Sequence, residues 1–129
     1  MILLVEDSAG VREYARDALL ELGYGVLDAA NVQEALRVVA KGPRISLLFT
    51  DVVLGESNGR VLADKLRQIY PAVPVLFTTG YTRNAIVHQG RLDPDVHLLN
   101  KPFTQQDLAR KVRELLDAAE ASNLPQASS

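Results

Sequence analysis

Ile2-Leu3-Leu4-Val5-Glu6-Asp7 follows the initial methionine, and its four apolar residues end abruptly in two acids. A short apolar run without polar alternation is typical of a parallel β-strand that is covered on both faces. Four more runs of this kind occur along the chain, at Val26–Leu27, Ile45–Phe49, Val73–Phe77 and Val96–Leu99. We therefore expect five parallel strands, the first of which ends at the acid pair.

Segments with helical periodicity fill most of the intervals between these runs. Apolar residues recur every three or four positions in Val11–Leu22, Val32–Ala40, Leu62–Ile69 and Leu108–Ala119. Asn31 with Glu34 predicts a capping box at the start of the second of these helices, and Thr104 with Asp107 predicts a weaker one before the last. A further short helix is expected around Asn84–His88.

Strands that alternate with helices predict an α/β protein with a doubly wound parallel sheet. Right-handed crossovers restrict the topology, and strand order 2-1-3-4-5 of the flavodoxin-like three-layer α/β/α fold is the common solution at this length. The chain has 129 residues, 47% of them hydrophobic, so we expect one domain over residues 1–121. The small and polar residues 122–129 are expected to form a disordered tail.

Composition excludes several classes of function. The chain has no cysteine, which rules out disulfides, zinc–thiolate sites and thiol catalysis. Its apolar runs are too short for a membrane span or a secretory signal, and a net charge of −2 without a basic cluster is not typical of a nucleic-acid binder. We expect a cytoplasmic domain whose partner is a protein or a small ligand.

Reactive side chains stand at the carboxyl ends of four of the five expected strands. Glu6 and Asp7 follow the first strand, Asp51 the third, Thr79 the fourth and Lys101 the fifth. Ligands of such sheets bind at this edge. Each residue has an ordinary explanation as a helix cap, a turn residue or a strand residue, but four such events at converging strand ends are much less probable together.

The chemistry of this set is coherent. Three carboxylates held close together repel one another, and a hard divalent cation with oxygen ligands, Mg²⁺ above all, relieves that repulsion. A carboxylate can attack a phosphoryl group to form an aspartyl phosphate, and a metal ion and a lysine can stabilise the charge of the transferred group. The pattern therefore indicates magnesium-dependent phosphoryl transfer.

The sequences Leu3-Leu4-Val5-Glu6-Asp7, Asp51, Thr79-Gly80 and Lys101-Pro102-Phe103 together resemble the receiver domains of response regulators, over nearly the whole chain. The resemblance implies that Asp51 is the phosphoacceptor of a two-component phosphorelay. It also implies that Thr79 binds the phosphoryl group, that Lys101 is its cationic partner, and that the Lys101–Pro102 peptide bond is cis.

For the metal site, the resemblance implies four protein groups. Asp7 and Asp51 would bind Mg²⁺ directly, Glu6 would orient a metal-bound water, and the backbone carbonyl of Val53 would complete the set. The resemblance further implies a phosphodonor that is a histidine kinase or a histidine phosphotransfer protein. The domain would be a monomer or weak dimer that catalyses its own phosphorylation and dephosphorylation as a conformational switch, not a metabolic enzyme.

Two features depart from or refine this resemblance. Leu98 occupies a position where receivers often carry a switch Tyr or Phe, so we expect the signal to travel through the backbone of Gly80–Asp95 instead. Phe77-Thr78-Thr79-Gly80-Tyr81 resembles receivers of hybrid sensor histidine kinases and of some atypical single-domain regulators. His88 and His97 lack a supporting motif and are interpreted as surface or packing residues.

Two other classes of protein share part of this pattern. Phosphohydrolases of the haloacid dehalogenase type form an aspartyl phosphate but need an acid two residues after the nucleophile, where this chain has Val53. A flavodoxin-like flavin-binding module needs a neutral phosphate cradle after the first strand, where Glu6-Asp7 would repel the phosphate. The chain also has no P-loop, so a receiver domain is the preferred interpretation.

Overall fold

A five-stranded parallel sheet forms the centre of the protein in the computed structural model, which describes residues 1–54, 57–79, 87–88, 91–92 and 97–123. Its strands are β1 (Ile2–Val5), β2 (Val26–Ala29), β3 (Leu47–Asp51), β6 (Val75–Thr79) and β9 (His97–Asn100). They lie in the order β2-β1-β3-β6-β9, and every neighbouring pair is parallel. The predicted order 2-1-3-4-5 is therefore confirmed.

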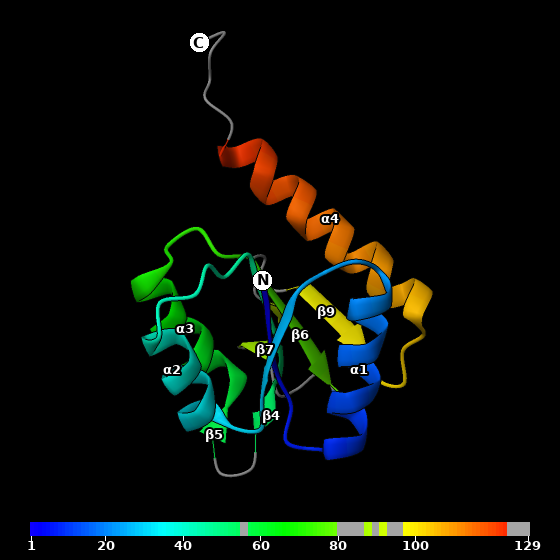
Figure 1. The fold of residues 1–129 in the computed structure, drawn as a ribbon, viewed down its shortest axis with the longest axis horizontal. Coiled ribbons are helices and arrows are strands. Elements are labelled where there is room, and N and C mark those ends of the chain that lie inside the picture. The colour runs from blue at the N-terminus through cyan, green and yellow to red at the C-terminus, as the bar shows by residue number, and fades with distance from the viewer. Residues whose placement is uncertain (55–56, 80–86, 89–90, 93–96, 124–129) are drawn as a thin grey trace, which may run out of the picture.

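Helices cover both faces of the sheet, which gives three layers (Figure 1). The described helices are α1 (Ala9–Glu21), α2 (Val32–Ala40), α3 (Gly59–Ile69) and α4 (Gln105–Asn123). Alternate residues of β1 point to opposite faces: Leu3 and Val5 pack in the core beneath α2 and α3, whereas Ile2 and Leu4 pack in the core beneath α1 and α4. The buried apolar runs predicted from the sequence are thus explained by two hydrophobic cores.

The Thr104–Asp107 capping box is present as predicted, whereas Asn31 caps its helix and Glu34 bonds back to Ala30, one residue before the cap. The Asn31 side chain accepts a hydrogen bond of 2.8 Å from the Glu34 N–H, and the Glu34 carboxylate accepts one of 3.2 Å from the Ala30 N–H. Thr104 and Asp107 exchange reciprocal backbone-to-side-chain hydrogen bonds of 3.0 and 3.2 Å. These contacts satisfy N–H groups that a helix start leaves without partners.

Two short antiparallel pairs supplement the main sheet: β4 (Val53–Leu54) with β5 (Ser57–Asn58), and β7 (Val87–His88) with β8 (Arg91–Leu92). The helix predicted around Asn84–His88 is wrong at Val87–His88, where the chain pairs as a strand instead; residues 84–86 lie outside the described part. Most of the Gly80–Asp95 segment is likewise outside it. Helix α4 continues to Asn123, and residues 124–129 are not described.

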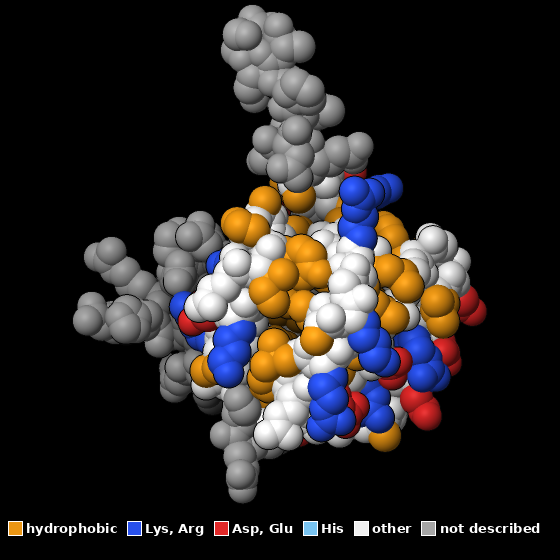
Figure 2. Space-filling view, turned by 60° about the vertical axis from the view of Figure 1, so that its left-hand side comes forward, with side chains coloured by type: hydrophobic (Ala, Val, Ile, Leu, Met, Phe, Trp, Pro, Cys, Tyr) orange, Lys and Arg blue, Asp and Glu red, His pale blue; other side chains and the backbone are white. Residues whose placement is uncertain are grey.

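A groove of about 670 Å³ lies at the amino ends of the strands, opposite the edge that carries the reactive side chains. Figure 2 shows a face on which hydrophobic side chains gather around a hollow bordered by Lys and Arg. Ile69, expected on the buried stripe of its helix, is instead 55% exposed and lines this groove, because α3 ends there. No helix in the described ranges is both long enough and apolar enough to cross a bilayer.

Candidate functional site: an acidic cluster with one lysine

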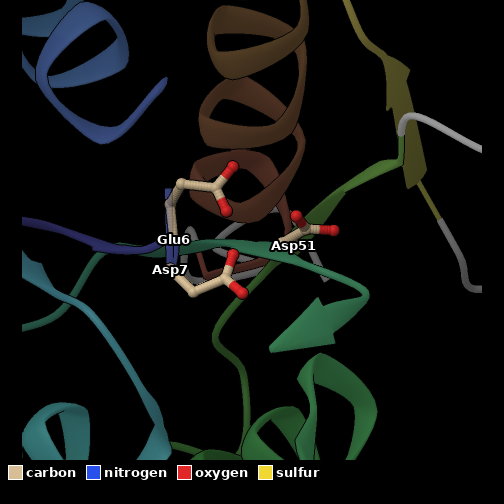
Figure 3. A group of neighbouring side chains, drawn as sticks. All are labelled: Glu6, Asp7 and Asp51. Carbon is tan, nitrogen blue, oxygen red and sulfur yellow. The ribbon is translucent and has the colours of Figure 1, made fainter. Parts of the chain in front are cut away.

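The carboxyl ends of β1 and β3 bring three acids together. Glu6 and Asp7 follow β1 directly, and Asp51 is the last residue of β3. Because Val5 pairs with Thr50 in the parallel register, the two strands end side by side. One carboxylate oxygen from each acid lies within 4.8 Å of the others, and Figure 3 shows the three groups around one space.

The acids differ in their exposure to water. Glu6 is 2% exposed and Asp51 is 8% exposed, whereas Asp7 lies at the surface. Placing ionised carboxylates in a buried position is costly unless a cation or hydrogen-bond donors compensate them. The cluster therefore needs positive charge.

Lys101 supplies part of that charge. Its ammonium lies 2.5 Å from Glu6 Oε1 and 2.7 Å from Asp51 Oδ2. Burial by itself lowers the pKa of Lys101, but the hydrogen bonds and charges of Asp51 and Glu6 outweigh it, and the pKa is raised. Lys101 is therefore held as a cation between two carboxylates.

Lys101 compensates only part of the charge and hydrogen-bonding capacity of the Glu6 carboxylate. The pKa of Glu6 is raised to about 7, because burial and the nearby charge of Asp51 outweigh the opposing hydrogen bond and charge of Lys101. The second oxygen of Glu6, Oε2, is buried and has no hydrogen-bond partner among the described residues. A buried acceptor of this kind is a site for a ligand, a water or an ion that can satisfy it.

Asp51 is held on both of its side-chain oxygens. Oδ2 accepts from Lys101, and Oδ1 accepts a hydrogen bond of 3.2 Å from the backbone N–H of Val53. The hydroxyl of Thr50 donates to the Asp51 carbonyl at 3.0 Å. The carboxylate is thus fixed at the edge of the sheet, and its group of hard oxygen donors fits Mg²⁺.

Gly59 allows α3 to begin directly against this acid. Its N–H donates to the Val52 carbonyl at 2.8 Å. A Cβ at this position would overlap the Asp51 carbonyl oxygen and would lie 3.0 Å from a carbon of the Thr50 side chain. A side chain at position 59 would therefore displace β3 or α3 at the point where Asp51 is presented.

Comparison with known proteins agrees with this geometry. Residues 2–113 match the family model of the response regulator receiver domain. The chain belongs to this family.

Relatives of this receiver domain include a sensor kinase and a response regulator receiver protein. It is 35% identical to Sensor kinase CckA of Brucella abortus over 90% of its own length, which corresponds to 12% of that protein. It is 34% identical to the response regulator receiver protein CpdR of the same organism, over 92% of this chain and 98% of the relative. The chain thus spans a small part of one relative and nearly all of another.

Solved structures of receiver domains superpose closely on it. A response regulator receiver protein from Sinorhizobium medicae has a TM-score of 0.81 at 27% identity, over 92% of this chain and 94% of that one. The receiver domain of the hybrid histidine kinase CckA has a TM-score of 0.74 at 35% identity, over 89% and 97% of the two chains. The receiver fold predicted from the sequence is therefore confirmed.

The receiver domain places most of the predicted site residues at one edge. Glu6, Asp7, Asp51 and Lys101 lie together, and Val53 follows Asp51 on β4. Thr79 ends β6 opposite Asn100, although its side chain lies outside the described part of the structure. The roles implied for these residues stay predictions.

Residues flagged as departures or as weak candidates also have defined positions. Leu98 pairs with Phe77 across β9 and β6, and it is a partly buried member of the core beneath α2 and α3. His97 is exposed at the start of β9, in agreement with its interpretation as a surface residue. For His88, only the backbone of β7 is described.

Sequence reasoning missed two residues of this site. Helical periodicity alone indicates a solvated position for Arg12, but its side chain is only 21% exposed and donates to the Glu6 carbonyl at 2.7 Å. Gly59 drew no attention, although Asn58-Gly59 before a helical stripe is a signal for a capped helix start. The Asn58 side chain does cap α3, by accepting a hydrogen bond of 2.9 Å from the Val61 N–H.

Proposed function

We propose that this receiver domain takes a phosphoryl group onto Asp51 from a phosphohistidine, in a reaction that requires Mg²⁺, and acts as a switch in a phosphorelay. The observation that carries the proposal is the position of Asp51, a buried acid at the end of a strand with a lysine ammonium 2.7 Å away. A carboxylate in that position is a nucleophile with a cation already beside it.

The proposed transfer forms one bond and breaks one. A carboxylate oxygen of Asp51 attacks phosphorus, the P–N bond of the phosphohistidine breaks, and its electron pair returns to the imidazole nitrogen. Lys101 would stay beside the transferred group and stabilise the charge on its oxygens, since positioning and electrostatic stabilisation dominate phosphoryl transfer. The N–H of Val53 would hold the carboxylate in place.

Glu6, Asp7, Asp51 and the carbonyl of Val53 would hold the Mg²⁺ ion. When bound, the ion neutralises both the crowded acids and the phosphoryl oxygens. Two observations support this assignment: the three carboxylates reach within 4.8 Å of one another, and Glu6 Oε2 is buried without a partner in the part of the chain that the structure describes. One lysine leaves this cluster with a net negative charge.

The two alternative functions fit the site less well. Val53 stands where a phosphohydrolase of the haloacid dehalogenase type needs its acid, and an exposed valine side chain cannot transfer a proton. A flavin phosphate would meet Glu6 and Asp7 at the end of β1. We therefore propose a signalling domain that catalyses its own phosphorylation and dephosphorylation.

The proposed donor is a histidine kinase or a histidine phosphotransfer protein. A hollow of about 680 Å³ adjoins Lys101 and is lined by apolar and aromatic groups of α1 and of the segment after β9, which are Gly10, Val11, Tyr14, Pro102 and Phe103. A protein helix that carries the phosphohistidine would fit against such a surface. We further propose a cytoplasmic monomer or weak dimer, either as a stand-alone regulator or within a hybrid kinase.

Phosphorylation by a small acyl phosphate with Mg²⁺ tests the proposal. We expect mass spectrometry to show one added phosphoryl group in the wild type and none in Asp51→Asn or after addition of EDTA. Asp64→Asn removes an exposed acid of α3 and is the matched control, in which labelling should be unchanged. Labelling of Asp51→Asn at the wild-type level would overturn the assignment of the phosphoacceptor.

A further inference from the structure

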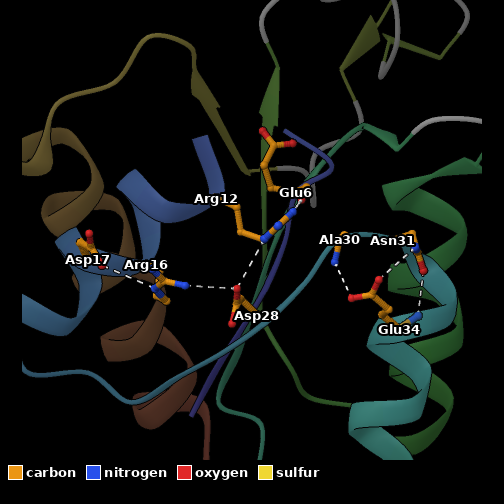
Figure 4. Close-up of polar contacts among 8 residues, drawn as sticks. All are labelled: Glu6, Arg12, Arg16, Asp17, Asp28, Ala30, Asn31 and Glu34. Atoms are coloured by element: carbon orange, nitrogen blue, oxygen red, sulfur yellow. Dashed lines mark hydrogen bonds and ion pairs between the residues drawn. The ribbon is translucent and has the colours of Figure 1, made fainter. Parts of the chain in front are cut away.

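Arg12 reaches from α1 back to the end of β1. Its Nη1 donates to the backbone carbonyl oxygen of Glu6 at 2.7 Å, a short hydrogen bond with a charged donor. Its side chain is 21% exposed, which is low for an arginine near the start of a surface helix. The contact is drawn in Figure 4.

Asp28 anchors this arginine from the neighbouring strand. Its Oδ2 lies 3.5 Å from Arg12 Nε, and β2, which carries Asp28, pairs with β1. The N–H of Glu6 donates to the Ala29 carbonyl at 3.1 Å. The backbone of Glu6 is therefore held on its N–H side by β2 and on its carbonyl side by Arg12.

The Glu6 carbonyl belongs to the peptide unit that joins Glu6 to Asp7. Fixing that plane sets the position of the Asp7 N–Cα bond and so restricts the directions in which the Asp7 side chain can leave the backbone. Within the described ranges, no hydrogen bond or ion pair to another side chain orients the Asp7 carboxylate. The orientation of this acid therefore depends on its backbone, and so on Arg12.

We propose that Arg12, anchored by Asp28, is a positioning residue that aims the Glu6–Asp7 acid pair at the cation it binds. The inference rests on the proposed function and extends it to a residue that contacts none of the three carboxylates of the site. Groups that orient metal ligands from behind typically change metal affinity 10- to 100-fold when they are removed, so we expect an effect of about tenfold.

Arg16 offers a matched control on the same helix. Its described contacts are the carboxylates of Asp28, at 3.7 Å, and of Asp17, at 3.5 Å. Arg16→Met therefore removes the same charge from the same network as Arg12→Met, and leaves the hydrogen bond to the Glu6 carbonyl in place.

Loss of a positive charge and loss of positioning change the Mg²⁺ affinity in opposite directions. Removing a positive charge near a cation site strengthens binding of the cation by Coulomb's law, and screening keeps the effect small. Loss of positioning weakens binding instead. We expect Arg16→Met to bind Mg²⁺ as tightly as the wild type or slightly more tightly, and Arg12→Met to bind it about tenfold more weakly.

Isothermal titration of Mg²⁺ into each purified protein measures this difference, with thermal unfolding in EDTA as the check of folding. Arg12→Lys keeps the charge and can restore one donor to the Glu6 carbonyl, so its dissociation constant should lie between those of the wild type and Arg12→Met. If Arg12→Met does not fold, the comparison of Arg12→Lys with Arg16→Met decides the question by the same criterion.

Two negative outcomes can be told apart. Equal Mg²⁺ affinity in the Arg12 and Arg16 variants, with a wild type that binds Mg²⁺, would overturn the positioning role and leave the proposed function intact. A wild type that neither binds Mg²⁺ nor accepts a phosphoryl group would overturn both.

Discussion

The ammonium of Lys101 lies 2.7 Å from Oδ2 of Asp51, the residue that we propose as the phosphoacceptor. The same ammonium contacts Glu6 at 2.5 Å, so a single lysine compensates two buried acids.

Lys101→Met should strongly destabilise the metal-free protein, because it leaves two buried carboxylates without their cation. Breaking a buried ion pair from one side costs on the order of 3 kcal/mol. Urea unfolding in EDTA at pH 8 measures the loss. Lys111→Met is the control, since Lys111 forms a surface pair with Glu114 at 3.9 Å and should change stability by less than about 1 kcal/mol. Similar losses in the two variants would contradict the buried pairing.

Asp7→Asn should stabilise the protein in EDTA by about 0.5 kcal/mol, because it removes a like charge beside Glu6 and Asp51 and breaks no ion pair within the described ranges. Asp51→Asn should gain less, since it also loses its contact with Lys101. With Mg²⁺ present, the wild type should instead be more stable than Asp7→Asn, because Mg²⁺ stabilises the wild type more. Thermal unfolding with and without Mg²⁺ tests both statements, and a less stable Asp7→Asn in EDTA would count against crowding of the acids.

The stability of the metal-free protein should fall as pH rises from about 4.5 to about 7. The pKa of Glu6 is about 7 in the folded protein against 4.5 for the unperturbed group, so the folded state holds this proton more tightly than the unfolded state. The stabilising contribution is complete below pH 4.5 and is lost as pH passes 7, with an upper limit of about 3 kcal/mol.

Comparison with Glu6→Gln tests this contribution, because the variant lacks the ionisable group whose pKa is raised. The free energy of unfolding should decline less between pH 5 and pH 8 in Glu6→Gln than in the wild type. Mg²⁺ affinity of the wild type should rise over the same range, since the cation competes with the Glu6 proton. If the free energy of unfolding of the two proteins in EDTA changes equally with pH, the pKa of Glu6 is not raised.

Gly59→Ala should destabilise the protein by about 1–3 kcal/mol, because the added Cβ overlaps the Asp51 carbonyl oxygen. It should also slow phosphorylation by shifting the acceptor. Gly10→Ala is the control within α1: no atom of the described residues lies within 4 Å of the position its Cβ would take, so stability should be unchanged or slightly higher. Urea unfolding and phosphorylation rates are measured for both variants. Equal stabilities and equal rates in the two variants would contradict the steric role of Gly59.

Much of the fold was predictable because its signals are local. Apolar runs such as Ile2–Val5 mark buried strands, and Asn31 with Glu34 marks a helix start through contacts three residues apart. Parallel strands place their carboxyl ends at one edge, so the order of the strands was sufficient to bring Glu6, Asp7 and Asp51 together.

Other features depend on contacts between residues distant in the sequence, and there the sequence was insufficient. Periodicity gave the buried face of α1 but not the turn of Arg12 back toward the Glu6 carbonyl, and it placed Ile69 in the core although it lies at an exposed helix end. Hydrophobic pattern reports which side of a helix is apolar, not where a long polar side chain finds its partner.

The sequence by itself determined which residues lie at the carboxyl ends of the strands, since strand order and chain direction bring them there. Only the tertiary structure decided their state: Lys101 between Glu6 and Asp51, Glu6 with a pKa of about 7, and Gly59 against the backbone of Asp51. The reason is that pKa values and steric limits depend on burial and on distances of a few ångströms. Those quantities arise when segments far apart in the chain pack together.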